Sequence, residues 1–430
     1  MQQGTVATGN EMEAINLLNS TELVRSLDEE IIIEGNGCEL VVTPKKLPGT
    51  EFQPATCDGA ACVVMLMSYS DAVEICRTLV TYTHPNVLKP IGIWKSKDDK
   101  AYLAFDEVHG SLKKKGNGYI FSIEDSSIYG FSANGLKAFR EIFSAVNYVN
   151  TQYKQDAESR HALKLVDSTI FYRTTAEDEV EAVLGVLYVK NPGPLANLKT
   201  KTRGSRGPTV EELERYNWTS TGDYIKGYFK GCVANDEIKH LVEFLKGASA
   251  NYDDLHWEPG LWEADIKMQF IREIWWHVEQ QRGSVKLIEL RETEKGKVLN
   301  SIRRPLGIIE CIRKLAEPEK AARIVEATLL DSVRHLRDSV VAHHGGSINA
   351  YQGAKEDVRD KVNLERLIQK AKGDYMIKLV REIRPLKWIT ESPVLRDQNN
   401  YMECFYEMKQ AEEKKQKQQE QGKKHKGKPR

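Results

Sequence analysis

HPNVLKPIGIW (residues 84–94) and AYLAFDEVHGSL (residues 101–112) decide the fold of the first half of the chain. Each holds a short apolar run bounded by turn-forming residues, which is typical of strands. Before these two stretches, apolar residues recur at helical spacing over residues 70–81. After them, a longer run of the same spacing covers residues 135–150. Further strand-like apolar runs occupy residues 31–33, 40–42 and 62–67. The pattern predicts a sheet with one inserted helix, followed by a long helix.

Composition limits the classes of function. The 430 residues are 40% hydrophobic and 29% charged, which is typical of globular proteins. Lys plus Arg and Asp plus Glu both count 62, so any polyanion must be bound locally, for example by the basic cluster Lys113–Lys115. No apolar run reaches the roughly 18 residues of a membrane helix, and residues 1–13 are too polar for a signal peptide. The seven cysteines form no CxxC pair, which argues against a disulfide framework or a zinc site. We therefore expect a reducing compartment, the cytoplasm or nucleus, and no membrane.

The second half differs in character. Residues 191–208 are rich in Pro, Gly and basic residues and mark the expected domain boundary. Beyond them, helical spacing is found at residues 236–247, 262–281, 298–315, 318–344 and 364–383. Residues 410–430 are basic and almost free of apolar side chains, so we expect this tail to be disordered.

The first half resembles a protein kinase. Residues 84–94, 101–112 and 135–150 are similar to the strand after the regulatory helix, the hinge, and the helix that opens the large lobe. The chemical devices of a kinase are missing from the sequence. Only Gly35 and Gly37 remain of the glycine-rich loop, and Met65 stands at the position of the phosphate-binding lysine.

The remaining devices are absent or ambiguous. Glu74 could match the helix carboxylate of a kinase, but a solvated surface charge is the simpler interpretation. No HRD or DFG triplet follows the long helix. The resemblance thus implies a degenerate, truncated pseudokinase, for which neither kinase activity nor ATP binding is expected.

One predicted helix in the second half carries basic residues where apolar ones are expected. Taken as one helix, Ile324–His344 places Arg337 and His344 inside its apolar face, His343 at the edge of that face and Asp338 on the polar side. A structural Arg–carboxylate pair with a capping histidine would explain this. So would metal-free phosphodiester cleavage, in which arginine stabilises the charged phosphorane and histidine transfers protons.

The same segment carries a second resemblance. Arg337-Asp338 followed by His343-His344 is similar to the R-[NDH]-x(3–5)-H signature of the HEPN ribonuclease superfamily. More narrowly, residues 330–344 resemble the kinase-extension nuclease (KEN) domain, which follows the kinase domain in the unfolded-protein-response sensors of the inositol-requiring-enzyme type and in RNase L. Residues 236–249 and 375–386 are similar to the opening and closing segments of that domain.

These resemblances imply an endoribonuclease of the 2′-hydroxyl transesterification type. It would cleave single-stranded or loop RNA as a dimer, without metal or cofactor, using Arg337, Asp338, His343 and His344. The implied partner is a second copy or a related kinase/nuclease. The departures are Asp338 where the family has Asn, a His343 one residue too far from Arg337, and no tyrosine between Tyr252 and Tyr351. They leave open the alternative of an inactive scaffold that regulates a competent relative by dimerisation.

The expected fold class is α+β, with a degenerate kinase-like domain before an all-α KEN-like domain. The expected parts are a polar arm (1–28), the kinase-like domain (29–192), a linker with a remnant of the large lobe (193–230), the KEN-like domain (231–395) and the basic tail (396–430).

Overall fold

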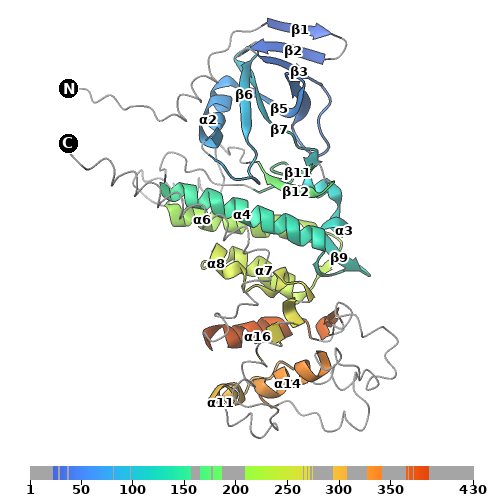
Figure 1. Ribbon diagram of the computed structural model, residues 1–430, viewed down its shortest axis with the longest axis vertical. Coiled ribbons are helices and arrows are strands. Elements are labelled where there is room, and N and C mark those ends of the chain that lie inside the picture. The colour runs from blue at the N-terminus through green and yellow to red at the C-terminus, as the bar shows by residue number, and fades with distance from the viewer. Residues whose placement is uncertain are drawn as a thin grey trace, which may run out of the picture. The chain divides into compact units, whose positions relative to one another are not determined.

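The computed structural model describes the ranges 23–27, 30–35, 38–80, 82–96, 98–155, 165–175, 178–185, 209–264, 266–268, 270–271, 274, 294–307, 327–340, 365–366, 368–370 and 372–386 (Figure 1). None of the helices in these ranges combines the length and apolar character that a membrane crossing needs. The chain divides into two compact units. The first comprises residues 1–126, 131–232 and 242–252, and the second comprises residues 127–130, 233–241 and 253–430.

A seven-stranded antiparallel sheet forms the start of the first unit within the described residues, in the order β1-β2-β3-β4-β5-β7-β6 (Figure 1). Its strands are β1 (Leu23–Leu27), β2 (Glu30–Gly35), β3 (Cys38–Val42), β4 (Gln53–Cys57), β5 (Ala60–Ser68), β6 (Pro90–Lys95) and β7 (Lys100–Asp106). The strands expected from the apolar runs are thereby confirmed. β1 lies inside the stretch for which the sequence suggests only a polar arm, and it pairs along its length with β2.

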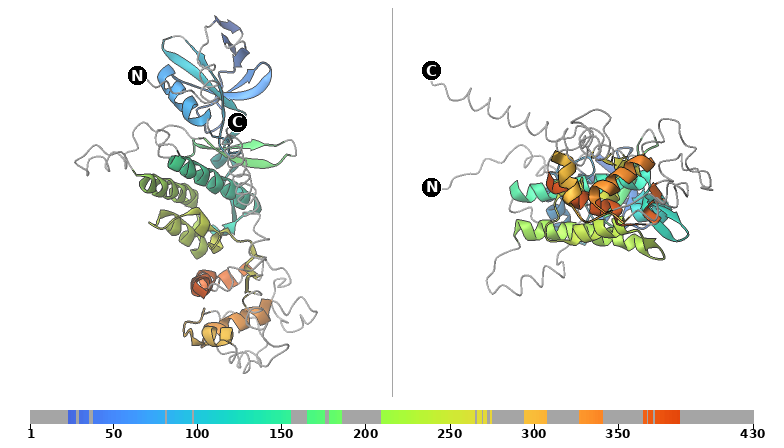
Figure 2. Two further views of the ribbon diagram at one scale, coloured as in Figure 1. Left: turned by 60° about the vertical axis from the view of Figure 1, so that its left-hand side comes forward. Right: turned by 90° about the horizontal axis from the view of Figure 1, so that it is seen from below.

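The sheet is strongly curved (Figure 2). β2 and β6 contact each other although four strands separate them in the hydrogen-bonded order, because the sheet curves back on itself. Side chains alternate between the faces of a strand, and the inward set forms one buried cluster. This cluster contains Ile33, Leu40, Val42, Ala55, Cys62, Val64, Trp94, Tyr102 and Ala104.

Two predicted helices accompany this sheet. α2 (Tyr69–Val80) buries Ala72, Ile75, Cys76 and Leu79 and packs against β5, β6 and β7. α4 (Ala133–Gln155) confirms the expected long helix and extends it at both ends. α6 (Val210–Lys226) packs on α4, where buried Asn217 donates from Nδ2 to Asn150 Oδ1 over 2.7 Å.

Short elements complete the first unit. They are β8 (Gly110–Ser111), η1 (Leu112–Lys115), α3 (Asn117–Ile120), β9 (Phe121–Glu124), β11 (Ile170–Thr174), β12 (Val180–Leu184) and η2 (Gly227–Phe229). β8, β11 and β12 form a small antiparallel sheet.

The second unit is mainly helical. It contains most of α7 (Asp236–Lys246), together with α8 (Tyr252–Leu255), η3 (Pro259–Leu261), α11 (Glu294–Ser301), α14 (Leu329–Val340), α16 (Tyr375–Ile383) and η6 (Arg384–Leu386). It is not purely helical, because β13 (Val233–Ala234) pairs in parallel with Ser127 and Ile128 of β10 (Ser127–Phe131). The expectation of an all-α region from residue 231 is corrected to that extent.

Three helices differ from their expected bounds. The helix expected at 298–315 ends at Ser301, and residues 302–306, which include Pro305, are not helical. The helix expected at 364–383 is interrupted at residues 372–374. Gly373 lies there, and a Cβ on it would approach Asp236 Oδ2 to 2.7 Å.

The third correction concerns the helix that carries the predicted nuclease residues. α14 begins at Leu329, whereas the sequence suggests a continuous helix through Ile324. Thr328 Oγ1 accepts from the backbone N–H of Asp331 over 3.2 Å, and Asp331 Oδ2 accepts from the N–H of Thr328 over 3.1 Å. This reciprocal pairing is a capping box, which fixes the first turn of the helix.

Candidate functional site

A hollow of about 330 Å³ lies against β3, β4 and β5. Val41 of β3, Thr56 of β4 and Val63 of β5 line it, together with Ala55 and Cys62 of the core cluster. The segment after β7 closes one side with Glu107, Val108 and His109. The lining residues include no lysine or arginine, so the hollow offers no cationic side chain to a phosphate.

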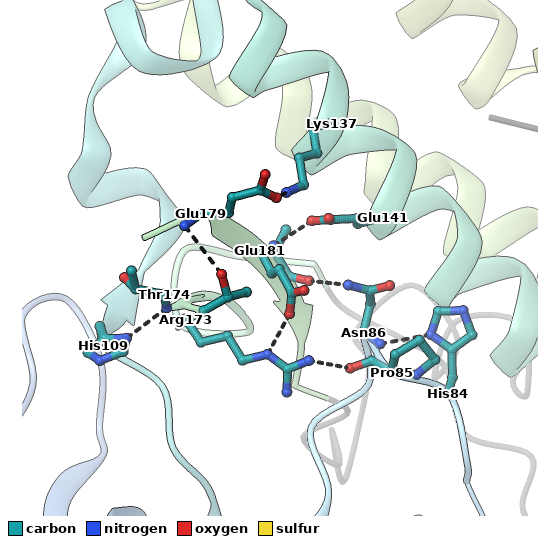
Figure 3. A network of polar contacts seen from close by, with 12 residues as sticks. His84, Pro85, Asn86, His109, Lys137, Glu141, Arg173, Thr174, Glu179 and Glu181 are labelled. Atoms are coloured by element: carbon teal, nitrogen blue, oxygen red, sulfur yellow. Dashed lines mark hydrogen bonds and ion pairs between the residues drawn. The ribbon is translucent and has the colours of Figure 1, made fainter. Parts of the chain in front are cut away.

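His109 ties the segment after β7 to β11 (Figure 3). Its Nδ1 accepts from the backbone N–H of Thr174 over 3.1 Å, so the proton of the neutral ring lies on Nε2. Nε2 lies 3.6 Å from Glu107 Oε1, and the ring stacks on Tyr172. The position of this segment is therefore set by contacts outside the large sheet.

The phosphate-binding devices expected from the kinase resemblance are not assembled at this hollow. β5 carries Met65 and no basic residue, so Glu74, partly buried on α2, has no lysine opposite it on that strand. The loop that lines the hollow lies between β3 and β4 and contributes Thr43 and Leu47. Gly35, which the resemblance assigns to the glycine-rich loop, ends β2 and therefore precedes β3, whereas the loop that lines the hollow follows β3.

The predicted nuclease residues are only partly covered by the structure. Arg337 and Asp338 belong to α14, and their side chains are not among those described. The side chains of Leu330, Val333 and Leu336 are fully buried, which confirms the expected apolar face for the described part of the helix. Arg337 follows Val333 by about one turn. His343 and His344 lie outside the described residues, so the assembly of the four residues stays a prediction.

Sequence reasoning missed a polar network in the first unit (Figure 3). His84 is buried between two fixed partners: its Nδ1 accepts from the N–H of Asn86 over 3.0 Å, and its Nε2 lies 3.0 Å from Ser144 Oγ on α4. Burial lowers the pKa of His84 to about 4, so the ring is neutral at pH 7. Asn86 Nδ2 donates to the carbonyl of Ala182 over 3.0 Å. The sequence did hold a sign of this network, because His84 and Asn86 belong to the HPN triplet at residues 84–86 that is part of the kinase resemblance.

Carboxylates on the other side of this network are already engaged (Figure 3). Glu141 Oε2 accepts from the N–H of Ala182 over 2.6 Å, and burial raises the pKa of Glu141 to about 7. Glu181 accepts from Arg173 Nε over 2.7 Å, and Glu179 accepts from Lys137 Nζ over 2.5 Å. Glu141 and Lys137 thus join α4 to the β11–β12 hairpin, and Arg173–Glu181 joins the two strands of that hairpin.

The basic cluster of η1 also has partners. The Nζ of Lys113 lies 3.4 Å from the centre of the Tyr228 ring, and that of Lys115 lies 4.2 Å from the Tyr172 ring. Burial lowers the pKa of Lys113. Of the expected exposed cluster, only Lys114 is exposed, and its two neighbours lie partly buried over aromatic rings.

In the second unit, a buried charge cluster lies between α7 and two further helical segments. Lys267 Nζ is 2.6 Å from Glu237 Oε2 and 2.8 Å from Glu365 Oε1. All three side chains are less than 10% exposed. Burial raises the pKa of Glu237 to about 7, and the two carboxylates raise the pKa of Lys267. A single ammonium thus holds two carboxylates in the interior.

The described residues contain one group of side chains that could hold a metal ion. Cys38, Cys57 and Asp58 place their ligand atoms within 4.8 Å of one another. This group is distinct from the expected nuclease residues.

Comparisons with known proteins add little. The chain matches no protein-family model and no curated protein. Among solved structures it is similar to that of Rad53 residues 1–466 in complex with AMP-PNP, with 14% identity and a TM-score of 0.30. The match covers 49% of this chain and 61% of that chain. A TM-score of 0.30 is too low to carry an argument, so the fold rests on the strand pairings themselves.

Proposed function

We propose that the chain combines a pseudokinase with a KEN-like ribonuclease, and that the second unit acts on single-stranded or loop RNA as a dimer. The observation that carries the first part is the hollow of the first unit. It lies beside a hinge-like segment but has no cationic lining, and β5 has Met65 where a kinase needs lysine. The first unit then serves to position and pair the second.

The helix α14 supports the second part of the proposal. Its capping box and its buried residues Leu330, Val333 and Leu336 fix the register of the helix, and Arg337 lies one turn beyond Val333. Arginine at that register would stabilise the phosphorane, and His343 or His344 would move protons between the 2′-hydroxyl and the leaving oxygen.

The test is cleavage of loop-containing RNA by the purified full chain in the presence of a chelator. We expect products with 2′,3′-cyclic phosphate ends that are lost in R337A and in H343A/H344A. R303A is the matched control, because Arg303 is an exposed arginine of the same unit, and this variant should cleave normally. A purified dimer that leaves every structured RNA intact would contradict the nuclease.

A second candidate function is a catalytically inactive scaffold that regulates a competent relative by dimerisation. Asp338, in place of the family's asparagine, and the missing tyrosine favour it. A D338N variant separates the two proposals. A gain of RNA cleavage would indicate a weakened nuclease, whereas unchanged inactivity with intact dimerisation, measured by sedimentation, would indicate a scaffold.

A further inference from the structure

Two cysteines that are far apart in the sequence lie side by side in the first unit. The register pairs Leu40 of β3 with Cys57 of β4. Cys38 is two residues before Leu40, so it lies on the same face of the sheet and diagonally next to Cys57. Both side chains are partly buried and pack against the core cluster of that face. Strand pairing, rather than a local sequence motif, therefore brings the two thiols together.

The neighbouring carboxylate is held by backbone contacts. Asp58 and Gly59 form the two-residue turn between β4 and β5, with φ angles of 49° and 79°, as a type I′ hairpin requires. Asp58 Oδ1 accepts from the N–H of Glu39 over 2.9 Å, and the N–H of Asp58 donates to Glu39 O over 3.0 Å. Since Glu39 is the residue after Cys38, these bonds fix the carboxylate beside both sulfur atoms.

Two thiols and a carboxylate at this spacing resemble the ligand set of a zinc ion. The two Sγ atoms and a carboxylate oxygen of Asp58 all lie within 4.8 Å of one another. Tetrahedral zinc, with Zn–S bonds of about 2.3 Å, separates two thiolates by about 3.8 Å, which small side-chain rotations can reach from here. We propose that Cys38, Cys57 and Asp58 bind a thiophilic divalent ion of the zinc class, with water as the fourth ligand. Exposed Asp58 provides the entry side for the ion.

The three groups already contact one another without an ion, because the Cys38 thiol hydrogen bonds to Cys57 and Asp58. An ion that binds here would displace the thiol protons to solvent, since the thiolate is the form that ligates a metal.

The experiment is a titration of the full chain with Cd²⁺ in a buffer that contains a phosphine reductant. We expect the sulfur-to-cadmium charge-transfer absorbance of a two-thiolate site in the ultraviolet. It should be lost in C38S and in C57S, and Zn²⁺ should compete it away. C232S is the matched control, because Cys232 is a partly buried free cysteine of the same unit, and this variant should keep the absorbance.

D58N tests the third ligand without disturbing the turn. Asparagine tolerates positive φ and can still accept from Glu39, but it has no negative charge. Affinity for Cd²⁺ should fall while the two-thiolate absorbance at saturation is kept. Absorbance that survives in both C38S and C57S, or a Cys38–Cys57 disulfide found by mass spectrometry in the reduced protein, would overturn the proposal. RNA cleavage needs no metal, so this outcome is independent of the proposed function.

Discussion

At the scale of single residues, the first unit holds a carboxylate whose charge opposes folding. Glu141 accepts a hydrogen bond from Ala182, yet burial raises its pKa from 4.5 to about 7. A carboxyl with a raised pKa in the folded state contributes stability that is complete below about pH 4.5 and is lost as the pH rises through about 7. The wild-type chain therefore loses stability over this window because the buried group must ionise.

We expect E141Q to remove this pH dependence. The amide oxygen of glutamine can still accept from Ala182, but it never ionises. At pH 8 the variant should be more stable than the wild type, by on the order of 2 kcal/mol after allowance for partial exposure. At pH 4.5 the two should be nearly equal. Urea unfolding at both pH values measures this.

E179Q serves as the control for that prediction. Glu179 is fully exposed, and its bond with Lys137 lowers its pKa, so neutralising it should not stabilise the fold at pH 8. Equal effects of E141Q and E179Q at pH 8 would contradict the role assigned to burial.

The second unit depends on one buried ammonium. Lys267 contacts Glu237 and Glu365, and removing it leaves two buried carboxylates without a counter-charge. Loss of one partner of a buried ion pair typically destabilises a protein by about 3–5 kcal/mol. We expect K267M to lower the free energy of unfolding of the second unit by this amount, measured by urea titration.

Two further variants check that interpretation. K239M removes a surface lysine that pairs with Asp236, and it should change stability by less than about 1 kcal/mol. The triple variant K267M/E237Q/E365Q removes all three charges and should recover much of the loss. If K267M alone unfolds no more easily than K239M, the cluster does not carry the stability assigned to it.

At the scale of elements, α4 begins at a close approach to α3. A Cβ on Gly135 would lie 1.8 Å from the carbonyl oxygen of Ile120, a backbone atom that cannot move aside easily. Alanine normally favours a helix over glycine by about 1 kcal/mol. Here we expect G135A to destabilise by about 1–3 kcal/mol instead, because the two backbones must separate. G118A in α3 is the control, since a Cβ there meets nothing within 4 Å. The unfolding temperature of G135A should therefore fall below that of the wild type, whereas that of G118A should not.

The elements also show how far sequence reasoning reaches. The period of the apolar residues predicted α2, α4, α7 and the strands, because that period determines which face is buried. It failed where a local polar contact started a helix. The Thr328–Asp331 capping box stood in the sequence as the signature T-x-x-D, yet apolar spacing alone carried the helix through it. Contacts between distant residues, such as those of Gly373 with Asp236 or Cys38 with Cys57, leave no local signal.

At the scale of the whole molecule, the first unit has the order of strands and helix expected from the kinase resemblance, and the lining of its hollow includes no lysine or arginine. Strands β3, β4 and β5 and the segment after β7 line this hollow, which carries Glu107 and His109 as well as apolar side chains. Arg173–Glu181 joins β11 to β12, and Lys137–Glu179 ties this hairpin to α4, so both carboxylates already have cationic partners. The sheet with its inserted helix was predicted from the sequence. The ion pairs of Glu179 and Glu181 were not predicted, because they depend on how the β11–β12 hairpin packs against α4.

The charge of the hollow leads to a prediction about nucleotides. Triphosphate binding needs cationic side chains or metal-binding carboxylates near the phosphates. The lining of this hollow supplies Glu107 and His109, and Glu107 repels an anion unless a metal ion lies between them. We therefore expect Mg·ATP to leave the unfolding temperature of the full chain unchanged, since a ligand raises that temperature only by binding the folded state. Adenosine, which carries no phosphate, is the matched ligand control. If adenosine stabilises the chain and Mg·ATP does not, the phosphates are what the hollow rejects. A saturable rise with Mg·ATP would contradict the pseudokinase proposal, because cations outside this lining would then have to bind the phosphates.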